Sequence, residues 1–461
     1  MERKNCWKQY SDKRLNKMEE YTKEYMHFLN HSKTERECAD TVVNLVEKEG
    51  FKDLAALVRD KKKLKAGDKV YATWMNKAVI LCRIGEKPME VGMIIVASHI
   101  DSPRLDIKPN PLYENTGVAY LDTHYFGGIK IYQWVTLPLA IHGVVVKKDG
   151  ITEEICIGED KDDPVVFISD LLPHLSQEQQ EKKASELFGG EALDIVFGNR
   201  PMVKKGDEKE EKEAVKAQIL RLLEEMYDMK EEDFLSAELE VVPAGKAREA
   251  GLDRSMIMAY GQDDKVCAYA AIHALLHAKK LARTSVVMLT DKEEIGSCGA
   301  TGMTSHFYEN ALAEIMNLTG EYSSLKFRRA MAASNLLSAD VSSVFDPMFA
   351  DSFEQKLVFN KVTGARGKSG ANDANAEYLG TLRGLLDERE VTYQYAEYGR
   401  IDLGGSGTIS HILAEYAMNV VDCGTAVMNM HAPYEVTSKV DVYETMRGYR
   451  AFLEDFDLCR N

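Results

Sequence analysis

Hydrophobic and polar residues follow two patterns along the first hundred positions. Residues 10–65 carry apolar positions at helical spacing, for example Val42 and Val46, and predict a group of helices. A short continuous apolar run follows at 91–97, and a similar run occupies 285–290. Such runs are typical of buried parallel strands. The pattern therefore predicts an α/β domain built around a largely parallel sheet.

From about residue 103 to 250 the pattern changes to that of β-hairpins. Residues 141–146 and 151–155 are strand-like and flank a turn at Asp149-Gly150. After about residue 255 the alternation of helices and apolar runs returns. The predicted fold is α/β, with a discontinuous domain whose mixed, largely parallel central sheet is flanked by helices. A β-rich insert interrupts it, with boundaries at 1–102, 103–252 and 253–461.

Composition narrows the classes of function. A chain of 461 residues with 45% hydrophobic residues suits a two-domain globular enzyme. Its net charge of −16 argues against nucleic acid and anionic membranes as partners, because both would repel it. Eight cysteines without a C-x-x-C pair indicate reduced thiols and a cytoplasmic protein. We expect neither a signal peptide nor a membrane span, since no suitable apolar segment occurs.

Two adjacent glutamates, Glu293 and Glu294, follow the run 285–290 and precede Gly296. The run predicts a buried strand and the glycine a turn, so both carboxylates should lie at a strand's carboxyl end, where open α/β sheets bind ligands. One glutamate could bind a metal while its neighbour transfers a proton. Alone, however, an acidic pair is more often a solvated surface feature.

Two other acidic motifs lie where elements begin or end. His99 and Asp101 follow the run 91–97, and a carboxylate at this spacing can accept the hydrogen bond of an imidazole whose other nitrogen binds a metal. Asp263 and Asp264 open a predicted helix, where one can cap the helix and the other can point at a metal. The local sequence leaves open which of the two does so.

Asp340 and His431 complete the set of candidate ligands. Each also has an ordinary explanation, as a turn residue and as a structural histidine. Together the candidates offer imidazole and carboxylate groups without thiolates, which suits Zn²⁺, Mn²⁺ or Co²⁺ in a two-metal hydrolase. The hypothesis takes as ligands His99, Asp263, Glu294, Asp340 and His431. Three carboxylates against the four charges of two divalent ions leave +1, which favours a bridging hydroxide at neutral pH.

The same hypothesis divides the glutamate pair into two roles. Asp263 is the natural bridge between the metals because it has two oxygens at a rigid helix start. Glu294 is a ligand, and Glu293 becomes the general base that takes the proton of water and returns it to the leaving amine. Asp101 orients His99.

These motifs, in this order, resemble the aspartyl aminopeptidase and vacuolar aminopeptidase I family of metallopeptidases over nearly the whole chain. The segments that carry the resemblance are 97–106, 262–265, 291–297, 338–340 and 430–431. The resemblance implies a dinuclear zinc aminopeptidase of zinc-exopeptidase fold that acts on peptides with free amino termini. It also implies an inserted dimerisation domain and a homo-oligomer, in which dimers build a tetrahedral dodecamer.

The resemblance also distributes the ligands. His99 and Asp340 would hold one metal, Glu294 and His431 the other, and Asp263 would bridge them, although the choice over Asp264 rests on the family pattern.

The resemblance further implies substrate contacts. His174 in the insert resembles a histidine that reaches a neighbouring subunit's site, and Met430 is expected to contact substrate. A basic pocket residue, Lys361 or Arg366, would favour amino-terminal Asp or Glu. Neutral hydrophobic residues are the alternative preference. Two less favoured hypotheses are a related two-metal amidohydrolase and a non-catalytic assembly protein. The glycine-rich segment 404–408 is expected to form a turn near the substrate.

Overall fold

The computed structural model describes residues 5–203, 212–344, 346–352, 359–361, 368–370, 372–396 and 407–457. The chain forms two compact units. The first contains residues 1–102, 247–430 and 435–461, and the second contains residues 103–246 and 431–434. The sequence predicts an insert over residues 103–252, and the longer segment of the second unit runs from Pro103 to Lys246.

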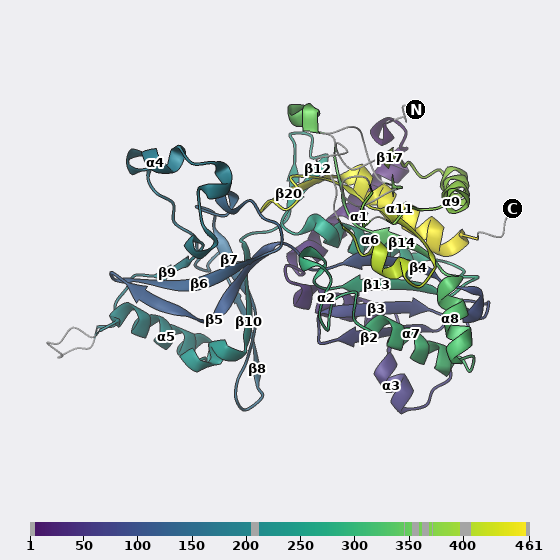
Figure 1. Ribbon diagram of the computed structural model, residues 1–461, viewed down its shortest axis with the longest axis horizontal. Helices are drawn as coiled ribbons and strands as arrows, with labels where there is room; N and C mark the ends of the chain where they lie inside the picture. Colours follow the sequence, from purple (N-terminus) through teal and green to yellow (C-terminus); the bar gives the residue numbers. More distant parts are fainter. Residues whose placement is uncertain are drawn as a thin grey trace. The chain divides into compact units, whose positions relative to one another are not determined.

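A mixed nine-stranded sheet forms the centre of the first unit in the described part of the chain. Neighbouring strands from β13 through β4 and β14 to β18 are parallel. Of these, β13, β4 and β14 are seen side by side in Figure 1. In spatial order the strands are β1 (Lys52–Asp53), β2 (Lys69–Trp74), β3 (Ala78–Arg83), β13 (Ser285–Thr290), β4 (Ile94–His99), β14 (Asn335–Ala339), β18 (Asn419–Cys423), β16 (Phe359–Asn360) and β17 (Tyr395–Ala396). This arrangement confirms the predicted mixed, largely parallel sheet.

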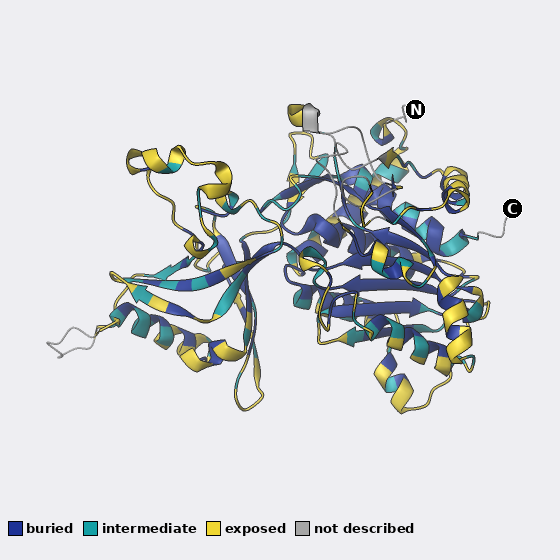
Figure 2. Ribbon diagram, viewed as in Figure 1, coloured by how far each residue is buried: buried dark blue, intermediate teal, exposed yellow. Residues whose placement is uncertain are grey.

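Helices cover both faces of this sheet because its central strands are apolar on both sides. On β13, Val287 and Leu289 enter one core cluster, whereas Val286 and Met288 enter the other. The first cluster is completed by α1 (Asp12–Asn30), α2 (Glu35–Lys48), α6 (Gln262–His277), α9 (Ala376–Glu388) and α11 (Lys439–Asp455). The second is completed by α3 (Leu54–Arg59), α7 (Phe307–Leu318), α8 (Ser324–Ala332) and α10 (Ser410–Ala414). The central strands are buried along their length (Figure 2).

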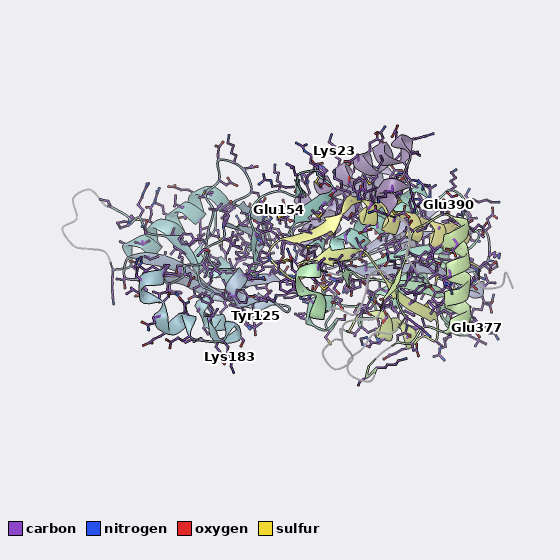
Figure 3. All side chains as sticks on the ribbon, turned by 90° about the horizontal axis from the view of Figure 1, so that it is seen from above. Lys23, Tyr125, Glu154, Lys183, Glu377 and Glu390 are labelled. Atoms are coloured by element: carbon purple, nitrogen blue, oxygen red, sulfur yellow. The ribbon has the colours of Figure 1, made fainter. Side chains whose placement is uncertain are left out.

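Local sequence explains where the helices begin. Thr34 and Glu37 form a capping box at the start of α2: the Thr34 hydroxyl accepts the Glu37 N–H at 3.1 Å, and the Glu37 carboxylate accepts the Thr34 N–H at 3.2 Å. On the outer surface, charged side chains such as Lys23, Glu377 and Glu390 project into solvent (Figure 3). No helix among the described residues has both the length and the apolar character needed to cross a membrane.

A second, five-stranded sheet in the first unit was not predicted. Its strands are β11 (Arg248–Ala250), β12 (Met256–Ala259), β20 (Glu435–Ser438), β19 (Ala426–Met428) and β15 (Ser342–Ser343). It matters for the site because β12 leads directly into α6 and because β19 and β20 flank the segment that contains His431.

The second unit is built on a six-stranded antiparallel sheet. The strands, in spatial order, are β8 (Thr152–Ile157), β7 (Leu139–Val146), β10 (Ala237–Pro243), β5 (Arg104–Asn115), β6 (Val118–Phe126) and β9 (Ile195–Gly198). The predicted hairpin is confirmed, since Val146 pairs with Thr152 across β7 and β8. Helix α5 (Ala214–Tyr227) packs on β5, β6 and β9, and the short α4 (Gln177–Gln180) lies in an exposed stretch (Figure 2).

Candidate metal centre

The order of the central strands brings three candidate segments to one edge of the sheet. β4 ends at His99, β14 ends just before Asp340, and β13 ends just before the loop with Glu293 and Glu294. In the register of the sheet Thr290 pairs directly with His99. Because the carboxyl ends of parallel strands share an edge, residues far apart in sequence meet there.

His99, Asp263 and Asp340 form a group that could hold a metal ion. Each offers one ligand atom, and these atoms lie within 4.8 Å of one another. His99 Nε2 is 3.3 Å from Asp263 Oδ1. Asp263 is the second residue of α6, and with φ −80° and ψ 107° it departs from helical geometry. One imidazole nitrogen and two carboxylates are a donor set that suits zinc.

Asp101 fixes the orientation of the His99 ring. His99 Nδ1 lies 3.1 Å from the Asp101 carbonyl oxygen and 3.3 Å from its Oδ1. Both are acceptors, so Nδ1 carries the ring proton in neutral histidine. Nε2 then keeps a lone pair that could bind a metal ion.

Asp101 also binds the loop that contains the glutamate pair. Its Oδ1 accepts the backbone N–H of Glu293 at 3.2 Å, and its Oδ2 accepts that of Glu294 at 3.1 Å. Both glutamates belong to a single 3₁₀ turn, η8 (Glu293–Ile295), preceded by Lys292 at φ 67°. A left-handed φ is uncommon outside glycine and is often found at functional sites. One buried carboxylate therefore ties His99 to both glutamates.

The two glutamates lie on the same side of this edge as the three-residue group. Glu294 and Asp263 offer carboxylate oxygens within 4.8 Å of each other. Glu293 acts on Asp340 electrostatically: burial raises the pKa of Asp340 well above its ordinary value, and the negative charges of Glu293 and Asp263 raise it further. Glu293 is thus near the group.

The charges of the site fit a divalent cation. Burial would lower the pKa of His99, but its contacts with Asp101 and Asp263 outweigh burial and raise that pKa well above the ordinary value. The carboxylates around His99 thus favour a positive charge at this position. A divalent ion in the same place would supply that charge and relieve the repulsion among the carboxylates.

Asp264 points elsewhere. Its Oδ2 accepts a hydrogen bond from the Ser98 hydroxyl at 2.5 Å, and its side chain is completely buried. Burial raises the pKa of Asp264 well above its ordinary value. Each group of potential ligands includes Asp263 and leaves out Asp264.

The other predicted site residues belong to other segments of the chain. His431 lies between β19 and β20 in the segment that groups with the second unit, and its Nδ1 is 2.9 Å from the Gly128 carbonyl oxygen. Met430 packs partly against the core of the first unit. His174 and Lys361 are exposed. Residues 366 and 404–406, also named from the sequence, lie outside the described residues.

Three polar residues that the sequence did not single out form hydrogen bonds around the backbone of Asp263. They are Ser102, Lys265 and Glu435, all buried. The only available signal was adjacency, because Ser102 follows Asp101 and Lys265 follows Asp264. For Glu435 the sequence contained no such signal.

Comparisons with known proteins agree on one family. The model of the family described as "Aminopeptidase I zinc metalloprotease (M18)" matches residues 28–453. A protein of Clostridium acetobutylicum named "Probable M18 family aminopeptidase 1" is 52% identical over 98% of both chains. The crystal structure of an M18 aminopeptidase from Thermotoga maritima is 42% identical, covers 99% of this chain and 100% of its own, and superposes with a TM-score of 0.92.

A more distant structure shares the fold alone. It is the mApe1 dodecamer of S. cerevisiae, which is 18% identical and has a TM-score of 0.74. It covers 95% of this chain and 97% of its own.

Proposed function

Since the chain belongs to the M18 family of zinc metallo-aminopeptidases, we propose that it hydrolyses the amino-terminal peptide bond at a two-metal centre on the carboxyl edge of its central sheet. The observation that carries this proposal is the group of His99, Asp263 and Asp340, whose ligand atoms lie within 4.8 Å of one another. Membership of this family leaves the amidohydrolase and the non-catalytic assembly protein without support.

The proposed ligands divide between two sites. His99 and Asp340 would hold one ion, Glu294 and His431 would hold the other, and Asp263 would serve both. Support for Asp263 comes from its proximity to His99 and Asp340 on one side and to Glu294 on the other. Zinc is the expected metal, and cobalt or manganese would suit the same nitrogen and oxygen donors.

Glu293 is the proposed general base. The metal ions, when bound, supply Lewis-acid polarisation and make water more acidic. Glu293 then accepts the proton of the attacking water and passes it to the leaving amine. The hydrogen bond from its N–H to Asp101 holds the backbone of Glu293 at the edge of the site. Asp101 thereby aligns the base with His99, which it also orients.

Substitution of Glu293 tests this assignment. Glu293→Gln keeps the shape of the side chain but cannot accept a proton, so zinc content should stay normal while kcat falls by about 10²–10⁴-fold. Asp263→Asn and His431→Ala should instead lower zinc content, measured by mass spectrometry of the metal. Near-normal kcat in Glu293→Gln would remove Glu293 from its role. A fully loaded Asp263→Asn would point back to Asp264.

We further propose a preference for amino-terminal Asp or Glu. A lysine in the pocket would pair with an acidic side chain, and the described part of that segment places Lys361 at an exposed position. A panel of substrates with amino-terminal Asp, Glu, Leu, Met, Lys and Arg decides the matter. The ratio of kcat/KM for Asp over Leu should fall in Lys361→Met. An unchanged ratio, or a wild-type preference for Leu, would favour the hydrophobic alternative.

We propose that the second unit pairs copies of the chain and that dimers build a tetrahedral dodecamer. Within eleven residues it exposes five large apolar side chains to between 43% and 68%: Val165, Phe167, Leu171, Leu172 and Leu175. Such a concentration is typical of a covered interface. A distant relative has been solved as a dodecamer.

Substitutions in this segment test the assembly. Leu172→Asp combined with Leu175→Asp should reduce the particle mass in light scattering, whereas Leu252→Asp, at an exposed leucine of the first unit, is the control. An unchanged mass would refute the interface. His174, exposed in the same segment, is proposed to reach the partner copy's active site, so His174→Ala should raise KM without changing the mass.

A cytoplasmic location is also proposed. Support comes from the cysteines among the described residues, all of which are free thiols: Cys6, Cys38, Cys82, Cys156, Cys267, Cys298 and Cys423. Free thiols persist in reducing compartments.

A further inference from the structure

Lys265 buries its ammonium group beside the candidate metal centre. The residue is 1% exposed, and its Nζ donates a hydrogen bond to Ser102 Oγ at 2.6 Å. It also lies 5.8 Å from the centre of the Tyr260 ring. A buried lysine is costly unless its charge is compensated, so its position at the start of α6 calls for a physical reason.

The contact with Ser102 fixes the direction of a chain of hydrogen bonds. A lysine ammonium only donates, so the Ser102 oxygen acts as acceptor toward Lys265. The single proton of the Ser102 hydroxyl then points to the Asp263 carbonyl oxygen, which lies 2.9 Å away. The positive charge polarises the hydroxyl and strengthens this second bond. Lys265 thereby acts on the peptide group of Asp263.

The other backbone group of Asp263 is held from the opposite direction. Its N–H donates to Glu435 Oε2 at 2.9 Å, and Glu435 is 1% exposed. Gln262 fixes Glu435 in turn, because its side-chain amide donates to the Glu435 carbonyl oxygen at 2.7 Å. Side chains thus bind both polar backbone groups of Asp263, which leaves its carboxylate little freedom beyond its own two torsions.

We propose that Lys265 and Ser102 are positioning residues that hold the Asp263 carboxylate in the orientation that binds both metal ions. This inference rests on the proposed role of Asp263 as the shared ligand. Under this proposal Lys265 does more than offset nearby negative charge, because it helps to orient a ligand. Gly261 agrees with it, because a Cβ at that position would lie 3.0 Å from Ser102 Oγ and 3.1 Å from Lys265 Nζ. A side chain at this position would press on the pair, and the φ of 71° there also favours glycine.

Three variants test the proposal by zinc affinity, measured by competition with a chelator of known zinc affinity. Lys265→Met removes the charge at similar volume, Ser102→Ala keeps the charge but removes the relay, and Ser102→Thr keeps the hydroxyl. Residues that orient metal ligands typically contribute 10–100-fold to affinity, so Lys265→Met and Ser102→Ala should weaken zinc binding by about that factor. Ser102→Thr should stay within about threefold.

Lys439 offers a matched control. It is also 1% exposed and lies at the start of a helix, where its Nζ pairs with Glu19 at 2.6 Å and with Glu249 at 2.7 Å. Lys439→Met should lower the melting temperature without changing zinc affinity. A loss of zinc affinity in Lys439→Met equal to that in Lys265→Met would mean a general effect of removing a buried lysine and would overturn the proposal.

Asp263→Asn separates the two levels of inference. If Asp263→Asn binds zinc as tightly as wild type, the proposed ligand set fails. If Asp263→Asn loses zinc while Lys265→Met and Ser102→Ala keep wild-type affinity, the ligand set stands and the positioning proposal is wrong. Should Lys265→Met fail to fold, the serine variants decide: weaker binding in Ser102→Ala with rescue in Ser102→Thr supports the proposal, and wild-type affinity in Ser102→Ala overturns it.

Discussion

Replacement of Asp101 by asparagine disturbs three donors through one side chain. The Asp101 carboxylate accepts from the Glu293 N–H through Oδ1 and from the Glu294 N–H through Oδ2. Oδ1 also lies 3.3 Å from His99 Nδ1. An asparagine has one oxygen, which can accept from two of these three N–H groups. Its NH₂ group would then face the third N–H group, and two donors cannot form a hydrogen bond with each other.

The magnitude follows from these contacts. With its oxygen toward Glu293 and His99, asparagine leaves the Glu294 N–H opposed by another donor. A hydrogen bond to a charged group contributes about 1.5–3 kcal/mol, and an unsatisfied buried donor costs about 1–3 kcal/mol. We expect the distortion to weaken zinc binding by about 10–100-fold, which corresponds to about 1.4–2.7 kcal/mol. Glu294 should move most, because the remaining oxygen still serves the other two donors.

Zinc titration in a chelator buffer, together with kcat at saturating zinc, measures this effect. Asp101→Asn should lose zinc affinity and should remain slower than wild type even when loaded, because the loop of Glu293 has moved. Asp233→Asn is the control: this buried aspartate caps a turn in the second unit by accepting the Lys230 N–H at 2.8 Å. Wild-type zinc affinity in Asp101→Asn would refute the role assigned to Asp101.

Further predictions concern the ligand backbone, acid stability and metal removal. A Cβ on Gly424 would lie 1.9 Å from the Asp340 carbonyl oxygen, so Gly424→Ala should displace Asp340 and lower zinc content. Gly384→Ala, with open space around it, should keep normal zinc content. Equal zinc contents in the two variants would contradict this prediction. Burial lowers the pKa of His273 to about 3, so stability should fall as pH drops below about 6.5. His273→Phe should reduce that slope by about 1.4 kcal/mol per pH unit in denaturant titrations, and equal slopes would refute it. Chelation should lower the melting temperature and added zinc should restore it; no shift would mean that zinc does not stabilise the fold.

Much of the fold could be predicted because buried parallel strands leave a simple signature. The run 285–290 is a strand with those bounds, and the strand predicted at 91–97 is found at Ile94–His99. The five-stranded sheet escaped prediction because its strands are too short to show a period, as with Ser342–Ser343. Its pairings depend on segments far apart in sequence.

The same physics limits prediction of the site. The sequence indicates that Asp101 can orient His99, because the two residues are separated by Ile100 alone. It cannot show that Asp101 also meets the N–H groups of Glu293 and Glu294, since that contact exists only when β4 and β13 are paired. The role of Lys265 could not be predicted for a similar reason, because only the fold shows that its ammonium group is buried against Ser102.

The strand order of the first unit has a consequence for the chain as it is synthesised. β4 lies between β13 and β14, both of which leave the ribosome long after it. Until then both edges of an apolar strand lack their partners, which is a state prone to aggregation. All strands of the second unit, in contrast, come from residues 104–243 and can pair before β13 has been made. The second unit can therefore complete its sheet before the strands that carry the proposed metal ligands have all been synthesised.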